Sequence, residues 1–279
     1  YKNTLSSHKV EMIPERATVT GPHSVKLASG REVTAKYILV ATGAWPILPD
    51  IEGAEHGITS NEVFHLDQCP KRIVIVGGGY IANEFAGIFH QFGSHVTIVN
   101  RSGTLLRGYD EQIRDRLLQI SMTKGINFRF NAKMEKIEKN EDGTLCVRFK
   151  DGDPVPADVV LFATGRRPHT EGLGLDSAGV DLADNGAIKV DEYSRSSCES
   201  IYAVGDVTDR LQLTPVAIRE GHAFADTVFG DNPRTVDYDC VPSAVFSHPP
   251  LAGVGLTEAQ AKNKLGTVRV YTSDFRPMK

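Results

Sequence analysis

Two glycines, Gly77 and Gly79, lie between an apolar segment, residues 71–76, and a segment with helical spacing that begins at Tyr80 and has the small Ala82 as its third residue. A first glycine permits a tight turn, a second lets the backbone approach a pyrophosphate, and a small third residue lets the helix pack closely on the strand. Amide groups at the N-terminus of the helix would then bind phosphate oxygens. The pattern predicts the strand, turn and helix of a dinucleotide-binding site.

Two arginines, Arg101 and Arg107, follow the next apolar segment, residues 95–99. NAD-binding domains place an acidic residue directly after this strand, where it binds the ribose. Here the position is Asn100, so no carboxylate would repel a 2′-phosphate, and two guanidinium groups could bind one. The alternative is a pair of solvated loop arginines. We interpret the pair as a 2′-phosphate site that selects NADPH over NADH.

Asp206 ends a third apolar segment, residues 200–205, and could accept hydrogen bonds from a polyol. Thr214 and Pro215 then begin a predicted helix that continues to about residue 229, with proline in its first turn. The positive end of this helix would stabilise an anion developing on a flavin ring. The alternative is that Asp206 and Thr214 only cap turns and helices.

The elements that would position these residues include a partial internal repeat, residues 25–43 and 146–165. Each copy contains a turn glycine and ends in Ala-Thr-Gly, and each is predicted to be a hairpin followed by a buried strand that ends at a nucleotide crevice. In the second copy the glycine turn at Gly77 lies 88 positions before Gly165, whereas only 42 residues precede Gly43, the corresponding glycine of the first copy. We therefore expect the glycine turn of the first domain to lie upstream of Tyr1, in a longer protein, and residues 271–279 to be a strand-like segment.

Composition sets broad limits on the function. The chain has 279 residues, 41% of them hydrophobic, and a net charge of -4, which favours two ordinary globular domains. No segment approaches the roughly 18 apolar residues of a membrane span, and no basic and then apolar leader opens the chain, so we expect a cytoplasmic protein with no membrane contact. The basic residues are dispersed, so we expect no nucleic-acid partner.

Four cysteines, Cys69, Cys146, Cys198 and Cys240, are widely separated. None has a partner at the short spacing of a metal site or a local redox disulfide, so we expect no metal. Buried, reduced thiols are the simpler interpretation.

The predicted helix that follows the glycine turn, residues 80–92, carries large apolar residues at helical spacing. Ile81, Phe85, Ile88 and Phe89 are predicted to form its buried stripe. Gly87 is predicted to let the helix lie close to the sheet.

Together these motifs resemble the glutathione reductases, within the pyridine nucleotide-disulfide oxidoreductases, over essentially the whole chain. The plant and cyanobacterial type is the most similar, and the arginine pair differs from the NAD-linked lipoamide branch. The matching segments run from Gly77 to Gly87, from Asn100 to Arg107, from Ala163 to Pro168, from Tyr202 to Asp206 and from Val245 to Pro250.

The resemblance implies an α/β fold with two Rossmann-like domains, the first incomplete, and the start of an α+β interface domain. Residues 1–68 would be a partial FAD-binding domain, 69–190 an NADPH-binding domain, 191–236 a return segment of the FAD-binding domain and 237–279 the start of the dimerisation domain. The protein would form a homodimer.

The resemblance also implies roles for single residues. Tyr80 would shield the flavin until nicotinamide enters, Ile81 would line that pocket, and Glu84 would contact the carboxamide. For Glu84, an alternative is that it only interacts with the helix dipole from the first turn. The remaining implied contacts are Gly165, Gln212 and Val245 for the nicotinamide, and Ala17, Thr42, Gly43, Asp206 and Thr214 for FAD.

The implied reaction is hydride transfer from NADPH to FAD, then to an active-site disulfide, and finally to glutathione disulfide. The sequence contains no Cys-x4-Cys pair with its lysine partner for Glu84, and no C-terminal His-Glu pair. His248 precedes a proline, as the catalytic histidine of the family does, but by its position carries no such role. Two alternatives stay open: an inactive NADPH-binding fragment, and a reductase for another disulfide such as trypanothione.

Overall fold

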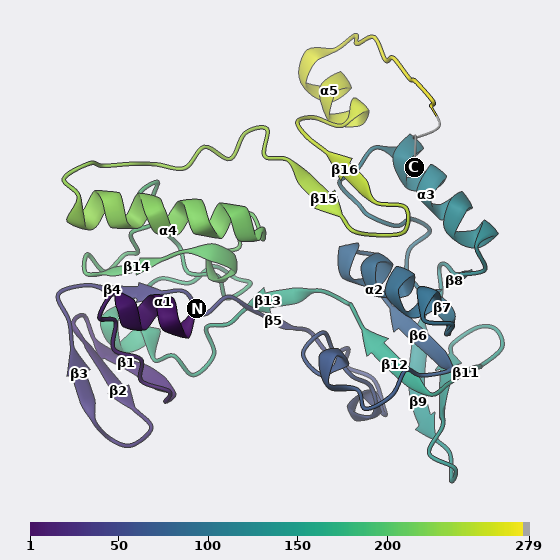
Figure 1. Cartoon of the computed structure of the whole chain (residues 1–279), viewed down its shortest axis with the longest axis horizontal. Coiled ribbons are helices and arrows are strands. Elements are labelled where there is room, and N and C mark those ends of the chain that lie inside the picture. Colours follow the sequence, from purple (N-terminus) through teal and green to yellow (C-terminus); the bar gives the residue numbers. More distant parts are fainter. Residues whose placement is uncertain (276–279) are drawn as a thin grey trace. The chain divides into compact units, whose positions relative to one another are not determined.

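The structure is a computed structural model that describes residues 1–275. The chain forms two compact units, and Figure 1 labels most of their helices and strands. The first unit comprises residues 1–45 and 167–237, and the second comprises residues 46–166 and the chain from 238 onward. The chain passes from one unit to the other within β5, Ala44–Pro46, and within β13, Arg166–Pro168.

The second unit contains a parallel sheet of four strands in the order β12-β6-β7-β8. Helix α2 connects β6 to β7, and α3 connects β7 to β8, as expected for parallel neighbours. Val76, Val99 and Phe162 lie in register, so three strands end at the same edge. The bounds are β6 Arg72–Val76, α2 Tyr80–Gln91, β7 His95–Val99, α3 Glu111–Thr123, β8 Asn127–Arg129 and β12 Val159–Phe162.

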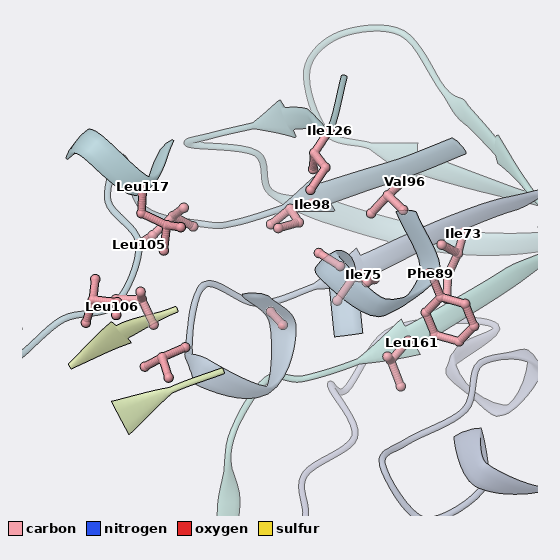
Figure 2. Close-up of a cluster of buried hydrophobic side chains, with 14 of the residues drawn as sticks. Ile73, Ile75, Phe89, Val96, Ile98, Leu105, Leu106, Leu117, Ile126 and Leu161 are labelled. Atoms are coloured by element: carbon pink, nitrogen blue, oxygen red, sulfur yellow. The ribbon is translucent and has the colours of Figure 1, made fainter. Parts of the chain in front are cut away.

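Alternate residues of this sheet enter two different cores, because successive side chains of a strand point to opposite faces. On one face Ile73, Ile75 and Leu161 pack with residues of α2 and α3, as Figure 2 shows. On the other face Val74 and Phe162 pack against a second, antiparallel sheet. That sheet has the order β11-β10-β9, with β9 Met134–Lys139, β10 Leu145–Phe149 and β11 Val155–Ala157.

The last part of the second unit is a hairpin and a short helix: β15 Ser243–Val245, β16 Leu251–Gly253 and α5 Glu258–Leu265. Val245 and Leu251 are buried in the same core as α2. Thr257 and Gln260 form a capping box at the start of α5. Two short 3₁₀ turns, η1 Ala54–His56 and η2 Val63–His65, precede β6.

The first unit contains an antiparallel sheet, β1-β2-β3, and a parallel pair, β4 and β14. A long helix, α4, follows β14 and the 3₁₀ turn η4. The bounds are α1 Lys2–Ser7, β1 Ala17–Gly21, β2 Ser24–Leu27, β3 Glu32–Thr34, β4 Ile38–Val40, η3 Leu175–Ala178, β14 Ile201–Ala203, η4 Gly205–Thr208 and α4 Thr214–Phe229.

The predicted α/β class and the internal repeat are both confirmed. Each copy is a hairpin, β2-β3 or β10-β11, followed by a parallel strand, β4 or β12. The prediction that both parallel strands are buried is wrong for β4, because Leu39 points away from the core that contains Val40 and is 39% exposed. Residues 271–275 are not a strand, and residues 276–279 of that predicted segment lie outside the described range.

Two predictions for α2 are wrong. Ile88 is 45% exposed, because the small residues Ala82 and Ala86 face the sheet and the larger ones flank them. Gly87 does not approach the sheet: a Cβ there would lie 3.3 Å from the Cβ of His248.

Candidate functional site

The predicted glycine turn connects β6 to α2 at the edge where three parallel strands end. Gly77 has a φ of +137°, and a Cβ there would lie 2.2 Å from the carbonyl oxygen of Ala163, so only glycine fits. Gly79 has an ordinary φ of -83°, and nothing lies within 4 Å of a Cβ placed on it. Ala82 is fully buried. The strand, turn and helix are thus confirmed, and Gly79 leaves open space at the helix N-terminus, where a pyrophosphate would fit.

The segment that follows β7 folds over this turn. Leu105 and Leu106 are buried in the core, as Figure 2 shows, and the Leu106 amide donates to the Gly78 carbonyl oxygen at 2.7 Å. Asn100 is 7% exposed, and its Nδ2 donates to the Thr104 carbonyl oxygen at 2.8 Å. The Leu106 amide therefore fixes the loop to the glycine turn, and the Asn100 side chain joins the start of the loop to Thr104.

Arg101 and Arg107 lie in this loop, and both are exposed. Neither guanidinium forms an ion pair or hydrogen bond with any other described residue. A phosphate group could therefore bind them without breaking an existing pair. The sequence indicates only that Asn100 is not acidic; that the Asn100 amide holds the loop was not predicted.

Three predicted nicotinamide residues lie on α2. Tyr80 is 44% exposed at the first helical position, and Ile81 and Glu84 are half-buried. The Glu84 Oε1 accepts a hydrogen bond from the Phe246 amide at 2.9 Å. Glu84 is the fifth residue of the helix, so the alternative that it interacts with the dipole from the first turn is wrong.

Two further predicted nicotinamide residues lie in the second unit. Gly165 follows β12 with a φ of +125°, and its carbonyl oxygen accepts a hydrogen bond from the Ile47 amide. Val245 is completely buried in β15.

The remaining predicted residues lie in the first unit. Asp206, in η4, is half-buried, and no donor among the described residues is hydrogen-bonded to its carboxylate. Thr214 is the first residue of α4 and is exposed, and the helix has no side-chain cap. The alternative that these two residues only act as caps is therefore wrong.

Other predicted side chains of the first unit already have partners. The Thr42 hydroxyl donates to the His169 carbonyl oxygen at 2.8 Å, and the neighbouring Gly43 carbonyl accepts from the His169 amide. The Gln212 Nε2 donates to Asp209 at 2.7 Å. Ala17 begins β1 and is half-buried.

The four cysteines are all unpaired, and the prediction that they are buried is wrong: Cys146 and Cys198 are only half-buried, and the other two are exposed. Cys69 and Cys240 are exposed, because they lie in connecting segments and not in the cores. Among residues 1–275 no cluster of three or more His, Cys, Asp or Glu side chains could hold a metal ion. In the same range no helix is long and apolar enough to cross a membrane.

Comparison with known families identifies the chain. Residues 1–221 match the family described as pyridine nucleotide-disulphide oxidoreductase. The chain belongs to this family. Residues 241–279 match the dimerisation domain of the same pyridine nucleotide-disulphide oxidoreductases.

Several members of this family are similar to the chain. Glutathione reductase from Burkholderia cepacia is 49% identical over the whole chain, and the chloroplastic/mitochondrial glutathione reductase of Pisum sativum is 46% identical. Trypanothione reductase from Trypanosoma congolense is 47% identical over 88% of the chain. The chain spans 62%, 50% and 50% of these three relatives.

A solved structure with a similar fold is the HOCl-induced flavoprotein disulfide reductase RclA from Escherichia coli. It is 32% identical, with a TM-score of 0.88 over 94% of this chain and 61% of that one. The mixed α/β fold with parallel sheets is thus the fold of pyridine nucleotide-disulphide oxidoreductases, and glutathione reductases of this family use FAD and NADPH.

Proposed function

We propose that the chain is the nucleotide-binding part of an NADPH-dependent flavoprotein that reduces glutathione disulfide. The observation that carries this proposal is the arginine loop, residues 100–107, which is hydrogen-bonded to the glycine turn. A loop in this place would bring two guanidinium groups to the ribose of a dinucleotide whose pyrophosphate lies at Gly79.

In this proposal the second unit binds NADPH. The amides that follow Gly77 and Gly79 would bind the pyrophosphate, and Arg101 and Arg107 would bind the 2′-phosphate. Ile81, Glu84, Gly165, Gln212 and Val245 would surround the nicotinamide. Tyr80 would cover the flavin until the nicotinamide enters.

In the first unit Ala17, Thr42, Gly43, Asp206 and Thr214 would hold FAD. The carboxylate of Asp206 suits a polyol, because hydroxyl groups could donate to its oxygens without displacing a described partner. The N-terminus of α4 would place positive charge beside the flavin. When bound, the two cofactors supply hydride transfer, and the protein orients them.

The domain boundaries are part of the proposal. Residues 1–68 and 191–236 would belong to the FAD-binding domain, 69–190 to the NADPH-binding domain and 237–279 to a dimerisation domain. The match of residues 241–279 to a dimerisation model supports a homodimer.

The experiment is NADPH oxidation by the natural protein that contains this sequence, with glutathione disulfide or trypanothione disulfide as the oxidant. We expect turnover with glutathione disulfide. Turnover with trypanothione disulfide alone would replace the proposed substrate, a possibility that the 47% identity to a trypanothione reductase makes worth testing. Binding of NADPH without turnover on either disulfide would support the inactive-fragment alternative.

A further inference from the structure

Glu220 is a charged residue in an otherwise apolar position of α4. Its side chain is 1% exposed, and its neighbours one turn away on the same face, Val216 and Phe224, are also buried. A buried carboxylate is costly unless other groups satisfy it. The groups that bond to the Glu220 carboxylate therefore show where in the fold its negative charge acts.

Those contacts lead to the turn that carries Asp206. The Glu220 Oε2 accepts a hydrogen bond from the Gly205 amide at 2.5 Å, and its Oε1 lies 3.2 Å from the Arg210 Nη2. The same Arg210 nitrogen donates to the Ser194 hydroxyl at 2.9 Å. The guanidinium thus neutralises the carboxylate and connects it to the segment that precedes β14.

Gly205 is held from both sides. It has a φ of +75°, and a Cβ on it would lie 3.3 Å from the Cβ of Ala217, so α4 packs directly on the turn. Its carbonyl oxygen accepts a hydrogen bond from the Thr208 hydroxyl at 2.9 Å. The carboxylate of the next residue, Asp206, has no hydrogen-bond or ion-pair partner among the described residues.

We propose that Glu220 is a positioning residue for the flavin, which fixes the Asp206 turn against the N-terminal end of α4, where Thr214 lies. This inference rests on the proposed FAD site. The Glu220 carboxylate would set the distance between Asp206, which would bind the polyol, and the N-terminus of α4, which would face the flavin ring. A purely structural role would be met as well by an apolar pair, because such replacements of buried ion pairs are often neutral or stabilising.

The test uses two double variants of the natural protein. Glu220→Leu with Arg210→Met removes the acceptor for the Gly205 amide and both charges of the ion pair. Glu220→Gln with Arg210→Met also removes both charges but keeps an oxygen that can accept from that amide. We expect the first variant to bind FAD roughly 10- to 100-fold more weakly, and the second to lie within about 3-fold of the wild type.

Amide hydrogen exchange in the FAD-free protein gives an independent measurement. The Gly205 amide should be protected in the wild type and in the Gln variant, and exchange faster in the Leu variant. Phe224→Leu is the matched control, because it changes the buried face of the same helix and removes no hydrogen bond of the turn. It should leave FAD affinity unchanged.

Three results would overturn the inference. These are wild-type FAD affinity in the Leu variant, failure of the Gln variant to recover affinity, and unchanged Gly205 exchange. A wild-type protein that takes up no FAD would instead overturn the proposed function, and this inference with it.

Discussion

Gly77 and Gly79 have different roles in the structure, and alanine substitutions separate those roles. At Gly77 a methyl group would meet the Ala163 carbonyl oxygen at 2.2 Å, on a backbone with positive φ. Strain of this kind costs about 1–3 kcal/mol before the clash is added. Because β12 leads directly into Ala163, the carbonyl cannot move without the strand, and we expect Gly77→Ala to lose more than about 4 kcal/mol of unfolding free energy.

At Gly79 the same methyl group enters open space at an ordinary φ. The unfolding free energy should change by no more than about 1 kcal/mol, since the loss of a glycine helix cap and the lower entropy of the unfolded chain oppose each other. The methyl group would occupy the proposed approach of the pyrophosphate. Losing two hydrogen bonds to that anion, each worth about 1.5–3 kcal/mol, weakens NADPH binding by about 100-fold or more.

The assay is thermal unfolding together with calorimetric titration of NADPH. Gly221→Ala is the control, because it adds a methyl group in open space within α4. It should stabilise the fold slightly and leave NADPH binding unchanged. Wild-type NADPH affinity in Gly79→Ala, or wild-type stability in Gly77→Ala, would refute the assignment of these roles.

Three further predictions concern charge and the loop. Replacing both Arg101 and Arg107 with Met should weaken NADPH binding about 100-fold and leave NADH binding nearly unchanged, and equal losses in titrations of the two nucleotides would contradict a 2′-phosphate site. Asn100→Leu removes the side-chain amide that holds the loop, so NADPH affinity should fall about 10-fold while NADH affinity is unaltered. An unchanged NADPH titration would show that the other contacts of the loop keep it in place without this amide. Hydrogen bonds from the side chain and amide of Arg72 lower the pKa of Asp158, so this carboxylate stabilises the fold above its unfolded pKa of about 3.9 and stops doing so as the pH falls through its folded value. In chemical unfolding, wild type should therefore exceed Asp158→Asn in stability at pH 7, and a gap that does not narrow as the pH falls below about 3.9 would refute the linkage.

The glycine turn could be predicted from the sequence because its requirements are local. A strand that turns directly into a helix needs small residues at fixed positions, and here these are Gly77, Gly79 and Ala82. The internal repeat was predictable for a similar reason, since turn glycines and alternating apolar residues depend on neighbours in the chain.

The role of Asn100 could not be predicted, because its partner oxygen at Thr104 reaches it only when the loop has closed. The exposure of Ile88 depends on which side of α2 comes closest to the sheet, and helical spacing alone leaves several adjacent faces possible. Glu220 did leave a signal in the sequence. It lies four residues from both Val216 and Phe224, and a charge in the middle of an apolar stripe indicates a buried pair.

The way the chain divides between the two units has a consequence for biosynthesis. Ile38 of β4 pairs with Ile201 of β14, which leaves the ribosome 163 residues later. At a synthesis rate of about 5–20 residues per second, β14 is synthesised on the order of 8–30 s after β4. During that time residues 46–166 are synthesised, and they contain every strand of the parallel sheet of the second unit. The parallel sheet of the second unit can therefore form before β4 pairs, and the apolar strand Ile38–Val40 has no partner strand during that interval.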